Sequence, residues 1–387
     1  MLPKTAGPLA AFAAFGAFWG AWGVLLPDVK EESGASVAEL GAALLAIGLS
    51  ALPAMLMTGR IVDRVGPRAL PPALLLFGGA VVLPGFAGSV WQLALALVLV
   101  GAASGALDVV INVAVTAIEA SGGPRVVQIG HALFSAGFLA AAILVGLLRE
   151  AGAGPLSVLV AVGGVLLLTA ALNRGAPGVR IATEGRRRLR ISRRLALLGA
   201  LCAIAFVVEG GIENWSALFL ESEHGASPAA AGFGPGLFAA AMVTGRVLGR
   251  SLEARIGDRL LLASGGVVAG VGLSLAAVSP SIVLALVGFV LGGAGISVAA
   301  PTLFGAAGRG ASDVERGTAV ASVTTVAYLG FLGGPPLIGA VSGALDLRAG
   351  MALLAGIALL LSAATASLAG GALPLRRLQH PARGDVP

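Results

Sequence analysis

The stretch Gly59-Arg60-Ile61-Val62-Asp63-Arg64-Val65-Gly66-Pro67-Arg68 (59–68) is a charged turn between two long apolar runs. Gly66 tolerates a positive φ and Pro67 disfavours the α region in the residue before it, so a helix that passes through Arg60 is expected to end here. A new apolar run begins at Leu70. In a soluble protein this stretch would be an ordinary solvated turn. Its position after the second of many apolar runs indicates a turn between two membrane-spanning helices.

The composition excludes the ordinary soluble classes. Of 387 residues, 57% are hydrophobic and 11% charged, with 59 glycines and a mean hydropathy of +0.97. A spanning helix needs about 20 apolar residues, and continuous runs favour helices over the alternating strands of a barrel. We predict an all-α membrane protein with twelve transmembrane helices, in the runs 7–26, 37–60, 69–88, 91–118, 126–148, 155–173, 195–219, 229–250, 260–279, 281–306, 318–340 and 350–371.

The positions of the basic residues predict the topology. With the N-terminus in the cytoplasm, all but three of the 25 lysines and arginines fall in cytoplasmic segments, Arg246 among them. The exceptions are Lys30, Arg149 and Arg348. The net charge of +6 therefore reflects topology rather than a nucleic-acid partner. We expect a multi-pass protein of the cell membrane (inner or plasma membrane), with both termini cytoplasmic and the lipid bilayer as its surroundings.

A basic segment divides the chain into two halves. Between 174 and 194 the sequence places eight arginines against one acid, Glu184. Such a run can bind RNA or anionic lipid, but no aromatic residues are interleaved, which favours a cytoplasmic linker. The predicted organisation is an N-terminal six-helix bundle (1–173), the linker (174–194) and a C-terminal six-helix bundle with a short cytoplasmic tail (195–387).

The second half repeats the turn of the first. The segment Ala254-Arg255-Ile256-Gly257-Asp258-Arg259 aligns with 63–68 at an offset of 191 residues (254 − 63), and each copy follows the second apolar run of its half. Ala254 stands where the first copy has Asp63. A repeat of six spans in the same orientation predicts two pseudo-repeats related by an axis along the membrane normal.

Acids inside apolar runs are the first candidate site residues. Asp108, Asn112 and Glu119 fall on one helical stripe, and Glu209 and Glu213 share a face at i, i+4 beside Asn214. A charge at mid-bilayer costs about 2.5 to 3.5 kcal/mol, so such groups face a cavity or a partner. Carboxylates as close as Glu209 and Glu213 repel each other, which suits a proton-coupling site. For Glu119 and Glu213 a solvated helix end is the alternative.

Three further residues are candidates with open alternatives. His131 lies near the start of the fifth apolar run and is either a proton relay or a neutral imidazole bonded to a neighbouring helix. Trp19 and Trp22 share a helix face and either line a cavity or anchor the helix at the membrane interface. In the run 281–306, three glycines and Pro301 predict a bend. The predicted cavity contains no Lys or Arg, so an anionic solute would find no countercharge there.

The stretch 59–68 matches G-x-x-x-D-R-x-G-x-R and resembles the loop between helices 2 and 3 of the major facilitator superfamily of secondary transporters. This resemblance implies that Asp63 caps a neighbouring helix and pairs with arginine, latching a cytoplasmic gate, and that the second copy is weaker or differently made. The implied gate residues are Gly59, Asp63, Arg64, Gly66 and Arg68, with Arg255, Gly257 and Arg259 in the repeat.

Four further combinations look like a bacterial branch of the superfamily that is distantly similar to fucose:proton symporters: L-D-x-x-x-N from Leu107, G-H-A-x-F-S from Gly130, E-G-x-x-x-x-W-S from Glu209 and G-F-L-G-G-P-P from Gly330. That similarity implies alternating access. The fifth run contains no proline, and the core of the fourth run contains no arginine. Both features differ from the pattern of typical drug:proton antiporters.

The sequence thus predicts a proton-coupled secondary active transporter of a small neutral polar (sugar-like) or cationic organic solute. Its partners are this solute and protons, and a monomer is expected. The alternatives are an efflux pump for lipophilic cations and a non-transporting membrane sensor. An enzyme is not expected, because the chain has no HExxH, no nucleophile-elbow sequence and three histidines in all. No cofactor or metal is predicted. The single cysteine, Cys202, allows no internal disulfide.

Overall fold

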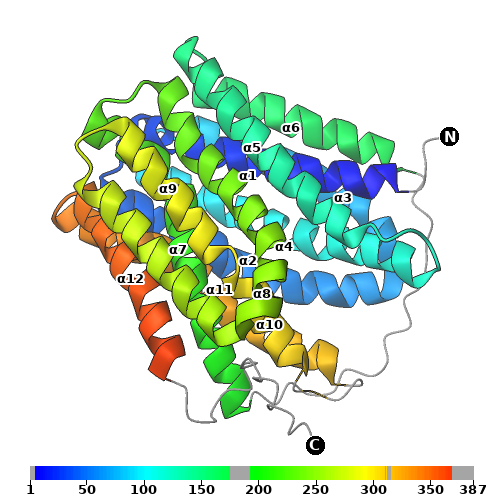
Figure 1. The fold of residues 1–387 in the computed structure, drawn as a ribbon. Coiled ribbons are helices and arrows are strands. Elements are labelled where there is room, and N and C mark those ends of the chain that lie inside the picture. Colours follow the sequence, from blue (N-terminus) through cyan, green and yellow to red (C-terminus); the bar gives the residue numbers. More distant parts are fainter. Residues whose placement is uncertain (1–4, 175–191, 310, 312–314, 368–387) are drawn as a thin grey trace, which may run out of the picture.

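The computed structural model describes residues 5–174, 192–309, 311 and 315–367, and these ranges are helical throughout apart from short turns (Figure 1). Most of the predicted linker and the tail beyond 367 lie outside them. Short 3-10 turns, η1 (Gly66–Ala69) and η2 (Leu83–Phe86), flank α3. The helices are α1 (Ala6–Glu32), α2 (Val37–Val65), α3 (Leu70–Ala80), α4 (Val90–Ala120), α5 (Val127–Glu150), α6 (Pro155–Leu172), α7 (Arg193–His224), α8 (Pro228–Val278), α9 (Ile282–Ile296), α10 (Ala299–Arg309), α11 (Arg316–Ala344) and α12 (Leu347–Ser367).

The count of transmembrane helices agrees with the sequence prediction. In the described residues, 11 helical segments are long and apolar enough to cross a membrane. One of them, Val37–Phe86, has 50 residues, more than twice the length that a span of about 20 residues needs. It is broken at Gly66, whose φ is 62°, so it contains two of the twelve expected runs. The run 281–306 is divided into α9 and α10 just after its glycines, where the bend was predicted.

The repeat is visible in the backbone. Gly257 inside α8 has a φ of 77°, so α8 consists of two spans that meet at the residue aligned with Gly66. The left-handed region is open to glycine without the steric cost that a Cβ brings. Both halves of the chain therefore break their second long helix at the same place in the repeat.

Helices α1–α6 and α7–α12 form two bundles with the same internal pairing. In the first, α1 packs on α5, α2 on α4 and α3 on α6. In the second, α7 packs on α11, α8 on α9, and α8 on α12. Between the bundles, α2 packs on α11, α5 on α8 and α1 on α7. This is the arrangement of two six-helix pseudo-repeats that the sequence predicted.

The bundles meet at one end of the molecule, which we call the closed end and define by Asp28, Gly41, Arg149, Glu221 and Gly339. A Cβ on Gly41 would lie 2.8 Å from the Cα of Gly339, so α2 and α11 touch backbone to backbone. The buried Arg149 of α5 binds Asp28 of α1 and, at 2.5 Å, Glu221 of α7. Its guanidinium therefore joins the two bundles.

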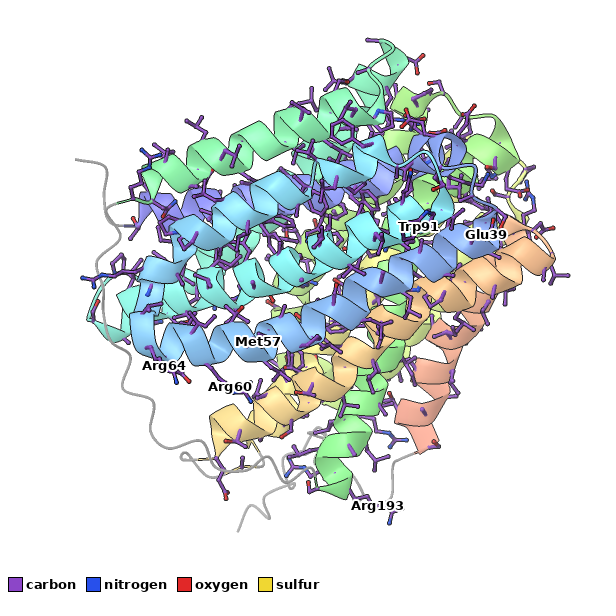
Figure 2. All side chains as sticks on the ribbon, turned by 180° about the vertical axis from the view of Figure 1, so that it is seen from behind. Glu39, Met57, Arg60, Arg64, Trp91 and Arg193 are labelled. Atoms are coloured by element: carbon purple, nitrogen blue, oxygen red, sulfur yellow. The ribbon has the colours of Figure 1, made fainter. Side chains whose placement is uncertain are left out.

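The bundles diverge toward the other end, which we call the open end and define by Arg60, Arg64 and Arg193. Figure 2 shows Glu39 and Trp91 near the closed end and these arginines around the opposite edge. Large apolar side chains such as Leu76 and Leu168 point outward along the bundles, as expected for a surface that faces lipid chains.

The Gly41→Ala substitution is expected to destabilise the contact between α2 and α11. A methyl group there meets backbone that cannot yield, and overpacking costs about 1 to 3 kcal/mol. Gly79→Ala is the matched control, because a Cβ on Gly79 of α3 meets no atom within 4 Å. Both variants gain the same helix propensity, so the difference between their melting temperatures reports the clash. Equal melting temperatures would contradict the contact.

Candidate functional site: a cavity between the two bundles

A cavity of about 300 Å³ lies between the bundles. Helices α1, α2, α4 and α5 contribute its lining from the first half, and α7 and α11 contribute from the second. This volume is at the lower end of the range of about 300 to 1,000 Å³ that is typical of small-molecule sites. The cavity is therefore shared by both halves and suits a small organic solute.

The structure brings the predicted cavity residues together. Seven of the eight line the cavity, and the eighth, Asn112, bonds to one of the seven. Trp19 and Trp22 are thus cavity residues of α1 rather than interface anchors. The seven lining residues are Trp19, Trp22, Asp108, His131, Glu209, Glu213 and Asn214.

Asp108 lies on α4 and is held by two neutral donors. The side-chain amide of Asn112, one turn later on the same helix, donates to Oδ1 at 3.1 Å. The hydroxyl of Tyr328 on α11 donates to Oδ2 at 3.3 Å, from the opposite bundle. Tyr328 is the only tyrosine of the chain, and its place in an otherwise apolar run is the one signal that could have identified it.

Glu209 is paired with a cation from the neighbouring helix α8. Nη2 of Arg246 lies 3.1 Å from Oε1 of Glu209. The prediction assigned Arg246 to a cytoplasmic segment and expected no lysine or arginine in the cavity. None is among the described lining residues, but α8 stays helical through Arg246 as far as Gly257, and the guanidinium reaches Glu209 on α7, a pairing that was not predicted.

Glu213 differs from the other two acids. It lies one turn beyond Glu209 on the same face of α7. Among the described residues its carboxylate makes no hydrogen bond or ion pair. Asn214 beside it donates its amide to the carbonyl of Gly210. Glu213 is thus the carboxylate of the cavity that remains available to a ligand.

His131 and Glu119 lie in different surroundings, one inside the cavity and the other outside it. His131 lines the cavity with its ring edge-on to Phe12 of α1, at a centroid distance of 5.1 Å. Within the described part of the chain its imidazole bonds to no neighbouring helix. Glu119 lies outside the cavity and accepts from the backbone N–H of Val127 at 2.9 Å, where it caps the start of α5.

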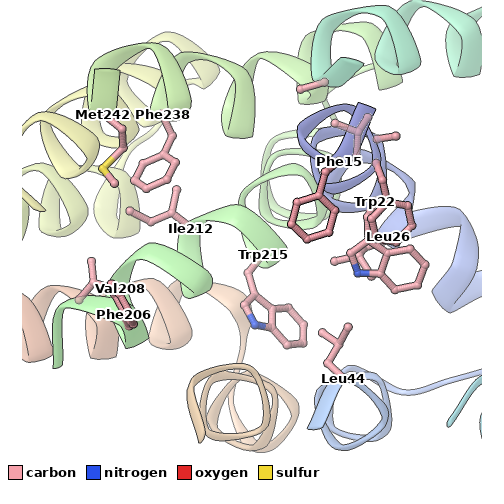
Figure 3. Close-up of a cluster of buried hydrophobic side chains, with 14 of the residues drawn as sticks. Phe15, Trp22, Leu26, Leu44, Phe206, Val208, Ile212, Trp215, Phe238 and Met242 are labelled. Carbon is pink, nitrogen blue, oxygen red and sulfur yellow. The ribbon is translucent and has the colours of Figure 1, made fainter. Parts of the chain in front are cut away.

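Aromatic side chains form much of the cavity surface. Phe15, Trp22 and Leu44 point toward one another from α1 and α2 (Figure 3). Phe15 packs edge-on to Trp19, and the rings of Phe206, Tyr328 and Phe331 pack against one another at tilted or edge-on angles between α7 and α11. We define the aromatic wall as the lining residues Phe12, Phe15, Trp19, Trp22, Phe134, Phe138, Tyr328 and Phe331.

The gate motif ends at the open end of the first bundle. Helix α2 stops at Val65, and η1 then packs against α2 and α4. Asp63 and Arg64 are exposed at this turn. Gly66 and the arginines of the motif therefore lie at a junction between helices, the position expected of a gate element. That Asp63 and Arg64 latch the gate remains a prediction.

The second copy of the motif carries its acid at another position. Asp258, which aligns with Pro67, is fully buried and binds Arg309 at the end of α10. Glu253 lies 3.6 Å from the same guanidinium. Arg259 donates to the carbonyl of Ala366 on α12. The second copy thus has Asp258 as a buried acid where it lacks one at Ala254. No local sequence pattern revealed that Asp258 pairs with Arg309.

Comparisons with known proteins agree with this geometry. The family model of the major facilitator superfamily matches residues 9–250 and 198–385. An uncharacterized MFS-type transporter of Yersinia pestis is 34% identical over 325 residues, which cover 82% of this chain and 83% of that protein. Membrane protein MosC of Rhizobium meliloti is 32% identical over 348 residues, covering 89% and 84%.

Solved structures share the fold. The nucleoside transporter NupG superposes with a TM-score of 0.78 at 15% identity, over 95% of this chain and 99% of that one. A bacterial homologue of the iron transporter ferroportin, in an inward-facing state, gives a TM-score of 0.74 at 17% identity, over 95% and 98%. The matched model spans both halves and the relatives cover most of the chain, so this protein belongs to the major facilitator superfamily of membrane transporters.

Proposed function

We propose that the protein is a proton-coupled secondary active transporter that moves a small neutral polar or cationic organic solute by alternating access. One observation carries this proposal: acids from both bundles, Asp108 on α4 and Glu209 and Glu213 on α7, line a single cavity between them. A site shared by two bodies that move against each other can take up ligands from one side and release them to the other.

The charges around the cavity support proton coupling. The wall contains three carboxylates, and one guanidinium, that of Arg246, meets Glu209. A charge held in a low-dielectric cavity is costly unless a proton or another ion neutralises it. Protons that bind Asp108 and Glu213 from whichever side is open would lower this cost, and they would thereby couple the movement of the bundles to the proton gradient.

The contacts between the bundles support alternating access. At the closed end, glycines and the Arg149 ion pairs hold α2 against α11 and α5 against α7. The open end carries the gate motif of both halves. With the charge pattern of the sequence, we assign the open end to the cytoplasm, so this conformation opens inward, like the ferroportin homologue.

Three rival functions are tested together by one design. A thermal-shift screen of the purified protein against sugars, nucleosides and organic cations identifies a solute, and flux into proteoliposomes with an imposed pH gradient follows. Nucleosides are included because NupG transports them. Accumulation that a protonophore abolishes is expected. Export of lipophilic cations would favour an efflux pump, a function with which the aromatic wall is also compatible. Binding with no flux of any kind would favour a sensor.

The Tyr328→Phe variant is expected to weaken solute transport several-fold without abolishing it. The variant keeps the ring in the aromatic wall but removes the hydroxyl that bonds Asp108, a contact worth about 1 kcal/mol, or about fivefold. Initial rates of solute uptake measure the effect. Thr244→Val, which removes an intrahelical hydroxyl contact on α8, is the control. Wild-type uptake by the Tyr328→Phe variant would show that the hydroxyl does not support Asp108.

A further inference from the structure

The three cavity acids are not equivalent, and the difference between them indicates what the cavity binds. Glu209 has a charged partner, Arg246, at 3.1 Å. Asp108 has two neutral donors, Asn112 and Tyr328, one on each oxygen. Within the described ranges Glu213 makes no hydrogen bond and no ion pair, although it lines the same cavity. Its carboxylate is therefore a vacant acceptor for a cationic group.

The position of Glu213 places aromatic faces beside this vacant carboxylate. Its backbone carbonyl abuts Gly23 of α1, where no side chain would fit. Trp19 and Trp22 are within one turn of Gly23 and line the same cavity. One turn earlier on α7, a Cβ on Gly210 would lie 2.9 Å from the ring of Phe331. Rings from both bundles therefore line the same cavity as Glu213, within about one helical turn of its backbone contacts.

An unsatisfied donor in the same wall also indicates a ligand. The side chain of Trp22 is 1% exposed, yet among the described residues its indole N–H has no hydrogen-bond partner. A buried donor without a partner costs about 1 to 3 kcal/mol, so such groups call for a specific explanation. A solute oxygen, or a water carried with the solute, would satisfy it.

Carboxylate and aromatic walls together select one class of solute. Aromatic faces attract cations through their quadrupole, and they also pack against flat apolar groups. The lining residues within the described chain include no lysine or arginine, and the guanidinium of Arg246 is engaged by Glu209. When Asp108 and Glu213 are deprotonated, they would repel an anion, and a neutral solute would leave Glu213 unpaired.

We infer that the transported solute is a small organic cation, whose ammonium-like group binds Glu213 while its ring or other apolar part lies against the aromatic wall. This inference rests on the proposed transport function and narrows its substrate class. It makes Glu213 the group that discriminates charge, and it leaves the pair of Glu209 and Arg246 intact while the solute is bound.

The test is calorimetric binding to the purified full chain in detergent, where no gradient is needed. The probes are 2-phenylethylamine, which is protonated at neutral pH, its neutral isostere 2-phenylethanol, and the anion 3-phenylpropionate. The amine is expected to bind at least about tenfold more tightly than the alcohol, and the anion most weakly. Equal affinities for amine and alcohol, or no binding of the amine at millimolar concentration, would overturn the inference.

Two variants locate the charge discrimination. Glu213→Gln is expected to lower the affinity for the amine at least about tenfold and to leave that for the alcohol unchanged, whereas Glu213→Asp keeps the preference for the amine. Glu31→Gln, at an exposed acid of α1, should match wild type. An unchanged amine preference in Glu213→Gln would refute the role of this residue.

Failure of the inference is distinguishable from failure of the proposed function. If the amine binds as expected but its flux ignores the pH gradient, proton coupling fails and the binding site stands. If a sugar binds and is accumulated while the amine does not bind, the inference is overturned and proton-coupled transport stands.

Discussion

The Asp108→Asn variant is expected to lose proton-driven accumulation of the solute while it retains exchange of solute across the membrane. The amide can still accept from Tyr328 and keeps the size of the side chain, so the cavity persists. It cannot take up and release a proton, so the halves can move with solute bound but not against its gradient. We expect the accumulation ratio in proteoliposomes to fall at least about tenfold, which corresponds to about 1.4 kcal/mol.

A matched substitution controls for the change of charge alone. Asp346→Asn alters an exposed aspartate at the start of α12 that caps the backbone N–H of Ala349, and asparagine is an equally good cap. It should accumulate solute like wild type. If Asp108→Asn accumulates solute as well as Asp346→Asn does, Asp108 carries no coupled proton.

The Arg149→Met variant is expected to open the closed end. Arg149 is 7% exposed and pairs with Asp28 and Glu221 on different bundles, so its removal leaves two carboxylates facing each other. Removing one partner of a buried ion pair costs about 3 to 5 kcal/mol, and we take about 3 because both acids keep some contact with water. That cost falls only on the conformation in which this end is closed. The population of this conformation, relative to the one in which the same end is open, should therefore drop about a hundredfold.

Spin labels on both sides of the closed end measure this change. Cysteines at the exposed positions Glu31 and Leu345, in a Cys202→Ala background, report the distance between the bundles. Arg348→Met is the matched control, because Arg348 pairs with Glu223 inside the second bundle at 3.0 Å. We expect a longer distance in Arg149→Met only. Superimposable distances in Arg149→Met and wild type, or the same lengthening in Arg348→Met, would refute the claim that Arg149 holds the two bundles together at the closed end.

The sequence predicted those features that depend on position along one helix. The apolar runs, the breaks at Gly66 and Gly257, and the shared face of Glu209 and Glu213 follow from local geometry alone. The turn of each motif could be found because glycine has a distinct backbone role. The five polar or ionisable residues among the seven that line the cavity could be found for a similar reason: a polar group inside an apolar run must face inward.

Partners contributed by another helix could not be predicted in this way. Tyr328 reaches Asp108 from 220 residues away in the sequence, and Arg246 on α8 reaches Glu209 on α7. The pairing of Asp258 with Arg309 likewise depends on where α10 ends. Such contacts are set by how helices cross, which one sequence does not encode in any short window. Charge counting assigned Arg246 to a cytoplasmic segment and gave no sign of its pairing with Glu209.

The most direct test of the central claim is the movement of protons that the solute evokes. The protein is reconstituted in vesicles that contain a pH-sensitive dye, the solute identified by the screen is added outside without an imposed gradient, and the internal pH is recorded. We predict a change of internal pH in wild type that is absent in Asp108→Asn, although labelled solute still exchanges in both. Solute flux in wild type without any proton movement, or an equal proton movement in Asp108→Asn, would contradict the account.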